Sequence, residues 1–187
     1  MQKLIDQLLS YKTSDQFEEA EKMAFANFLK RNDDALDRTN SIAHVTASSW
    51  IVNKTRTKVL MCFHNIYKSW SWTGGHADGD QNLVNVAIRE AKEETGLKNV
   101  NLVQQDFLDV EVIPVPPHLK RGFPVGNHLH LNVTFLLEAD ENEQLTAKPD
   151  ENSKVAWIDV EKLDEVVSEK NMLPLYHRLQ KKAESIK

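Results

Sequence analysis

Residues Gly74 to Leu97, GGHADGDQNLVNVAIREAKEETGL, contain the pattern that decides the fold. A glycine pair and a short polar loop come first, and a helix is predicted over Leu83–Thr95, with Gly96 as its C-terminal cap. Apolar residues recur at i, i+3, i+4 and i+7, which predicts one face that packs on a core. These residues are Val84, Ala87, Ile88 and Ala91.

The same helix carries three glutamates, Glu90, Glu93 and Glu94, directly after Arg89. At about 100° per residue the three fall within an arc of roughly 100°, centred on a different face from the apolar residues. Carboxylates at such close spacing repel one another. Mg²⁺ and Mn²⁺ take oxygen ligands, so the pattern predicts a site for a hard divalent cation.

The composition is that of an ordinary globular protein, with 187 residues, 41% of them apolar and 27% charged. A net charge of −5 gives no basic surface for a nucleic-acid duplex, so we expect no such partner. The single Cys62 lies in an apolar run and has no partner for an internal disulfide, as in a reducing compartment. No apolar run is long enough for a membrane span and no leader is visible, so we expect a cytoplasmic protein without a membrane partner.

Residues 1–34 are predicted to form an N-terminal helical extension, and residues 35–187 the main domain. Two apolar stripes at helical spacing, within 4–9 and 17–28, support the helices. Packing over the core is the expected role of these helices. A homodimer contact or a lid over the substrate is the alternative.

The main domain is predicted to be α/β, with a mixed sheet covered by helices. Apolar periodicity, prolines and polar breaks define the elements. Strands are expected at 43–53, 58–63, 102–114, 128–137 and 155–159, helices at 160–168 and 174–186, and loops at 118–127 and 140–154.

His128 and His130 alternate with apolar residues in the strand at 128–137 and therefore share its polar face. The polar face meets solvent in one interpretation, and in the other it lines a cleft where the imidazoles donate to phosphate or ribose. A zinc site is the least favoured interpretation, because no third ligand stands at a suitable spacing.

The central stretch resembles the Nudix box of the Nudix hydrolase superfamily: Gly, five residues, Glu, seven residues, Arg-Glu-aliphatic, any, Glu-Glu, any, Gly-aliphatic. Gln81 stands where the motif has its first Glu, and Ala91 stands where it has a bulkier aliphatic residue. The resemblance extends over roughly residues 40 to 165. The positions that match are Gly75, Arg89, Glu90, Glu93, Glu94, Gly96 and Leu97.

This resemblance implies an α/β/α sandwich around a mixed sheet. It also implies a Mg²⁺- or Mn²⁺-dependent hydrolase that cleaves a diphosphate bond in a small nucleotide derivative, a nucleoside diphosphate linked to another moiety such as ADP-ribose or a sugar. By motif position, Glu90, Glu93 and Glu94 are the expected metal ligands, together with the backbone carbonyl of Gly74. Arg89 is expected to hold the glutamates through a charge-assisted hydrogen bond.

Members of the family often add an acid from a late loop, and Glu151 is the predicted one here. His76, Arg38 and Trp72 are candidates for substrate binding, because they are near the glycine pair or carry a charge or ring that suits a nucleotide. A surface histidine, a surface charge and aromatic packing are the respective alternatives.

Gln81 leaves two hypotheses open, because an amide accepts hydrogen bonds but brings no negative charge. In the first, the other carboxylates suffice and hydrolysis is kept or lowered. In the second, the chain is a non-catalytic Nudix domain that binds or senses a nucleotide derivative. An isopentenyl diphosphate isomerase shares the fold but needs a cysteine near the glycine turn, which Cys62 does not supply.

Overall fold

The centre of the computed structural model, which describes residues 1–120 and 122–186, is a curved mixed sheet of eight strands. The strand order is β10-β2-β1-β9-β5, with β3 paired to β2, β4 to β1 and β6 to β9. β1 and β9 are parallel, and the other pairs are antiparallel. The strands are β1 (Ala43–Val52), β2 (Lys58–His64), β3 (Ser69–Ser71), β4 (Thr73–His76), β5 (Asn101–Leu102), β6 (Asp109–Val115), β9 (His128–Glu138) and β10 (Asn152–Asp159).

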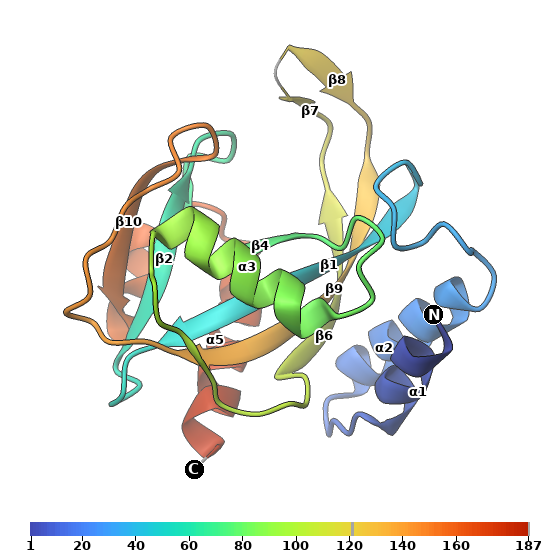
Figure 1. Ribbon diagram of the computed structural model, residues 1–187, viewed down its shortest axis with the longest axis horizontal. Coiled ribbons are helices and arrows are strands. Elements are labelled where there is room, and N and C mark those ends of the chain that lie inside the picture. The colour runs from blue at the N-terminus through green and yellow to red at the C-terminus, as the bar shows by residue number, and fades with distance from the viewer. Residues whose placement is uncertain (121, 187) are drawn as a thin grey trace.

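Helices cover both faces of this sheet (Figure 1). On β1, Val45 and Ala47 pack in the cluster that contains α3, whereas Trp50 and Val52 pack in the cluster under α5. Successive side chains of a strand point to opposite faces, which explains this division. The expected α/β sandwich around a mixed sheet is confirmed. The helices are α1 (Gln2–Ser10), α2 (Gln16–Leu29), α3 (Leu83–Thr95), α4 (Leu163–Val166) and α5 (Leu173–Ser185).

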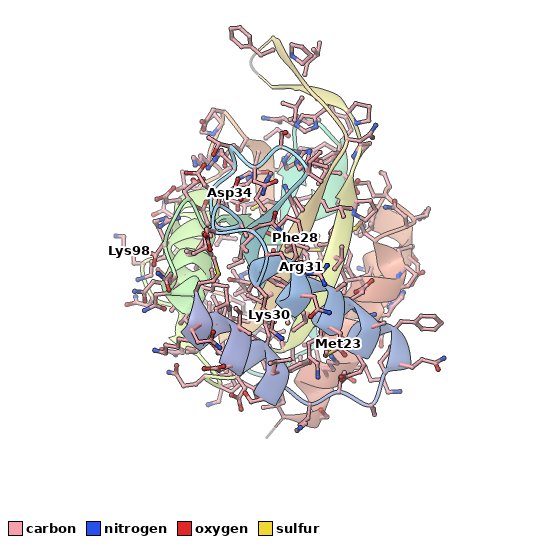
Figure 2. All side chains as sticks on the ribbon, turned by 90° about the vertical axis from the view of Figure 1, so that its right-hand side faces the viewer. Met23, Phe28, Lys30, Arg31, Asp34 and Lys98 are labelled. Carbon is pink, nitrogen blue, oxygen red and sulfur yellow. The ribbon has the colours of Figure 1, made fainter. Side chains whose placement is uncertain are left out.

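The two N-terminal helices pack into the core of the domain, as expected. Leu8 of α1 and Phe25 of α2 are fully buried in the same cluster as Val133 of β9. Figure 2, which looks onto α1 and α2 from outside, shows that Met23 of α2 lies on the side that faces the viewer. A homodimer through the outer side of these helices stays a prediction.

Buried ion pairs tie both ends of the chain to β6. The Lys182 ammonium of α5 lies 2.7 Å from the carboxylate of Glu18 on α2, and also 2.7 Å from that of Asp109 on β6. Arg178 donates to both oxygens of Asp109, at 2.8 and 2.7 Å. Both acids are fully buried, so each needs these cations to offset the loss of hydration.

Several predicted boundaries were wrong. β10 begins at Asn152, within the expected loop at 140–154. The expected loop at 118–127 contains a hairpin of β7 (His118–Lys120) and β8 (Phe123–Val125), which projects beyond the sheet (Figure 1). Its strands are too short to show a periodic pattern. The expected strand at 102–114 is interrupted between β5 and β6, and the expected helix at 160–168 is a 3-10 turn, Val160–Lys162, followed by the single turn of α4. Within the described parts of the chain, no helix is long and apolar enough to span a membrane.

Candidate active site

The glycine pair allows two close approaches of the backbone. A Cβ on Gly74 would lie 2.4 Å from the hydroxyl oxygen of Ser48, on the neighbouring strand β1. A Cβ on Gly75 would lie 2.4 Å from the carboxyl carbon of Glu90. Both distances are far below van der Waals contact. The pair therefore lets β4 press against β1 on one side and receive the Glu90 carboxylate on the other.

The glutamates of α3 differ in burial, which the helical pattern did not reveal. The buried face contains Leu83, Val86, Ala87 and Ala91, and it continues into Glu94, which is only 5% exposed. The expectation that all three glutamates lie on a face separate from the packed one was therefore wrong for Glu94. The spacing of four, four and three residues from Leu83 through Ala87 and Ala91 puts Glu94 on the packed stripe. Val84 and Ile88, which were expected on the packed face, are only partly buried.

Glu94 is held at the centre of the site by hydrogen bonds to both carboxylate oxygens. The backbone N–H of Gly74 donates to Oε1 at 2.9 Å, and the side-chain amide of Asn152 donates to Oε2 at 2.8 Å. Burial raises the pKa of Glu94 to about 7, and these two hydrogen bonds act in the opposite direction. Repulsion from Glu151 and Glu90 raises this pKa further, so these carboxylates lie near one another.

Arg89 lies beside the other two glutamates of the box. Its Nη2 donates to Oε1 of Glu90 at 3.0 Å, and its Nε lies 4.0 Å from Oε1 of Glu93. The side chain of Glu90 is 15% exposed and that of Glu93 is 48% exposed. The exposure of the carboxylates thus increases from the buried Glu94 to the open Glu93.

The late acidic loop brings Glu151 to the same place. Lys148 bridges the two groups, with its ammonium 3.5 Å from Oε2 of Glu93 and 3.2 Å from Oε2 of Glu151. Sequence reasoning selected Glu151 but missed Lys148 and Asn152. Lys148 lies in the loop and Asn152 is the first residue of β10. No periodicity marks either residue, and the pairing of β10 with β2 carries this part of the chain to the helix.

The donor set suits Mg²⁺ or Mn²⁺, which bind carboxylate and carbonyl oxygens. Glu94 forms no ion pair within residues 1–120 and 122–186, although it is buried beside two further acids. In the same part of the chain, the buried Oδ1 of Asn152 accepts no hydrogen bond. A cation near these oxygens would offset the repulsion. Glu90, Glu93 and Glu94 would hold it, and a contribution from the Gly74 carbonyl stays a prediction.

Gln81 lies outside this group of carboxylates. Its side chain is exposed in the loop before α3, where its amide oxygen accepts a hydrogen bond from the amino group of Met1. Arg38 pairs with Asp78, with Nε donating to Oδ1 at 2.6 Å. This hydrogen bond lowers the pKa of Asp78 and raises that of Arg38, and the nearby Glu90 raises the pKa of Arg38 further. Arg38 thus borders the box.

His128 and His130 belong to a larger group, the histidine cluster, which also contains His44 and His76. Nε2 of His128 lies 3.2 Å from Nε2 of His130, and the ring centroids of His44 lie 4.9, 5.0 and 5.1 Å from those of His76, His128 and His130. The expectation that no third nitrogen ligand is available was wrong. His44 stands opposite His130 only through the parallel register of β1 and β9, which the sequence does not state.

Trp72 packs under α5, with its ring centroid 5.7 Å from that of Tyr176. This arrangement favours the packing interpretation over stacking on a base. A pocket of about 550 Å³ opens instead beside His128. Its lining is mostly apolar and includes Ile42, Pro114, Val115 and Leu129.

Known proteins share this architecture. The family model of the NUDIX domain matches residues 43–179. The chain is 34% identical over 119 residues to an m7GpppN-mRNA hydrolase NUDT17 of Xenopus laevis, and 29% identical over 130 residues to that of Danio rerio. These matches cover 60% and 66% of this chain but only 38% and 41% of those relatives.

Solved structures agree on the fold. An Ap4A hydrolase of C. elegans superposes with a TM-score of 0.55 at 17% identity, covering 75% of this chain and 98% of that one. The dihydroneopterin triphosphate pyrophosphohydrolase of E. coli gives a TM-score of 0.53 at 16% identity, covering 73% and 92%. The matched domain includes the whole box and the strands that carry it. The chain therefore belongs to the Nudix hydrolase family.

Proposed function

We propose that this chain is a Mg²⁺- or Mn²⁺-dependent hydrolase, which cleaves a diphosphate bond in a nucleoside diphosphate linked to another moiety. The observation that carries the proposal is the buried Glu94, held by the Gly74 N–H and flanked by Glu90 and Glu151. A divalent cation bound there would polarise the diphosphate and help to generate the nucleophile from water.

The residues of the chain would divide the remaining work. Arg89 and Lys148 keep Glu93 oriented at the open side of the site. We assign the role of proton acceptor to Glu151, because it borders Glu94 and its side chain is 42% exposed, so water can reach it. Glu151 is distant from the box glutamates in sequence. It lies directly before β10, and the pairing of β10 with β2 brings it close to them.

The substrate class follows from the surroundings of the box. The imidazole of His128 borders an apolar pocket, which suits a base or another flat moiety. Relatives bear names that refer to m7GpppN-mRNA, Ap4A and dihydroneopterin triphosphate. All three compounds have phosphoanhydride chains, and they join ADP-ribose and nucleotide sugars as candidates.

A hydrolysis screen tests this proposal. Purified chain would be incubated with Mg²⁺ or Mn²⁺ and with capped dinucleotides, dinucleoside polyphosphates, ADP-ribose, nucleotide sugars and nucleoside triphosphates. The Glu93→Gln and Glu94→Gln variants are the controls. We expect metal-dependent cleavage of at least one class by the wild type, and at least ~10²-fold slower cleavage by either variant.

The alternative function is binding without cleavage, and Gln81 is the reason to test it. Because Gln81 lies exposed and away from the carboxylates, it removes no charge from the group around Glu94. This placement favours hydrolysis. Tight binding of a substrate by the wild type, with no product under any metal, would establish the alternative instead.

A further inference from the structure

Three histidines from different strands point ring nitrogens at one place. One ring nitrogen each from His44, His76 and His130 lies within 4.8 Å of those of the other two. Zn–N bonds of about 2.0–2.1 Å place tetrahedral ligands about 3.4 Å apart. His76 and His130 are only half buried, so their rings are not locked in the core and a bound ion could draw the nitrogens together.

The buried member of the group is oriented like a metal ligand. Nδ1 of His44 lies 2.9 Å from the backbone carbonyl oxygen of Asn40, to which it can only donate. This contact fixes the tautomer and leaves the lone pair on Nε2. Within the described residues, Nε2 of His44 is buried without a hydrogen-bond partner. Buried polar atoms are rarely left unpaired, so this nitrogen calls for a partner.

His128 repeats the arrangement at the edge of the group. Its Nδ1 lies 2.9 Å from the backbone carbonyl oxygen of Gly126, and its Nε2 lies 3.2 Å from Nε2 of His130. That separation is close to the spacing of two ligands on one tetrahedral ion. Two of the four rings are thus fixed by backbone carbonyls with Nε2 directed into the cluster.

We propose that His44, His76 and His130 bind a Zn²⁺ ion, with the fourth coordination position beside His128. Imidazole nitrogens suit Zn²⁺, whereas the carboxylates of α3 suit Mg²⁺ and Mn²⁺. The two sites therefore differ in ligand chemistry as well as in position. The zinc ion would fasten the adjacent ends of β1, β4 and β9, next to the glycine pair. This inference does not depend on the hydrolase activity.

Metal titration of the chelator-treated full chain tests the proposal. Zn²⁺ would be titrated in competition with a chromophoric chelator, in the presence of excess Mg²⁺, and Co²⁺ would replace Zn²⁺ for absorption spectra. We expect one equivalent of Zn²⁺ to bind, and Co²⁺ to show the visible bands of tetrahedral coordination. His44→Gln and His130→Gln should each weaken binding by at least ~10-fold, as much as the loss of an outer-shell partner.

Two variants serve as matched controls. His177→Gln removes an exposed histidine of α5, which pairs with Asp164 of α4. Glu93→Gln removes a carboxylate of the box. Both should keep the zinc affinity within about twofold of wild type, well below the loss from removing a ligand. Because His44 is buried, circular dichroism must show that His44→Gln folds. If it does not fold, the zinc affinity of the variant at the half-buried His130 decides the test.

Several results would overturn the zinc site. One is the absence of a tight equivalent of Zn²⁺ in the wild type. Another is unchanged affinity in a folded His130→Gln variant, and a third is an equal loss in Glu93→Gln, which would place the ion at the glutamates. Binding of inorganic phosphate that depends on His130, without zinc binding, would show that the cluster recognises an anion instead.

Discussion

Glu94 provides a test of the candidate active site that needs no substrate. Burial raises its pKa from 4.5 to about 7, so the folded, metal-free protein holds this proton up to a higher pH than the unfolded chain does. The contribution of this carboxyl group to the free energy of unfolding is therefore fully present below about pH 4.5, and it is lost as the pH rises through about 7. Glu94→Gln removes the dependence, because an amide does not titrate.

The size of the effect follows from the two pKa values. They differ by about 2.5, and each unit corresponds to about 1.4 kcal/mol, which gives a total of about 3–4 kcal/mol for this single group. Between about pH 5 and about pH 8, the free energy of unfolding of the wild type should therefore fall by roughly 2–3 kcal/mol relative to Glu94→Gln. Titrating groups that do not interact with Glu94 are common to both proteins and cancel in the comparison.

Urea denaturation of chelator-treated proteins at several pH values measures this difference. Glu93→Gln is the matched control, because the side chain of Glu93 is 48% exposed. The difference in free energy of unfolding between the wild type and this variant should change by less than about 1 kcal/mol over the same pH range. Saturating Mg²⁺ binds the ionised carboxylate and should restore the stability of the wild type above about pH 7. A pH-independent difference, or equal stabilisation of Glu94→Gln by Mg²⁺, would refute the reasoning.

Three further outcomes are expected. Glu93→Gln should lower the hydrolysis rate at least ~10²-fold with unchanged circular dichroism, because it removes charge from a proposed, exposed metal ligand; near-normal turnover would move the site elsewhere. Gln81→Glu should leave activity equal or higher in the same assay, and a collapse would reveal a specific role for the amide. Lys182→Met should lower the free energy of unfolding, measured by urea denaturation, by about 3 kcal/mol, because it leaves the buried Glu18 without its cation. Lys181→Met, at an exposed position, should change it little.

The sequence alone determined the elements whose signals are local. The helix Leu83–Thr95, its cap at Gly96 and the glycine pair lie within one continuous stretch, so their spacing could be read directly. Glutamates three and four residues apart must lie on neighbouring turns of a helix, whatever the rest of the chain does. The reaction class was predicted from the resemblance of this same continuous stretch to the Nudix box.

Tertiary structure decided everything that depends on pairing between distant strands. The parallel register of β1 and β9 sets His44 opposite His130, and the pairing of β10 with β2 brings Asn152 to Glu94. Burial of Glu94 was likewise invisible, because a helical wheel does not say which flank of an apolar stripe meets the sheet. Registers and packed faces arise from contacts across the whole chain, and a one-residue shift would have dispersed these groups.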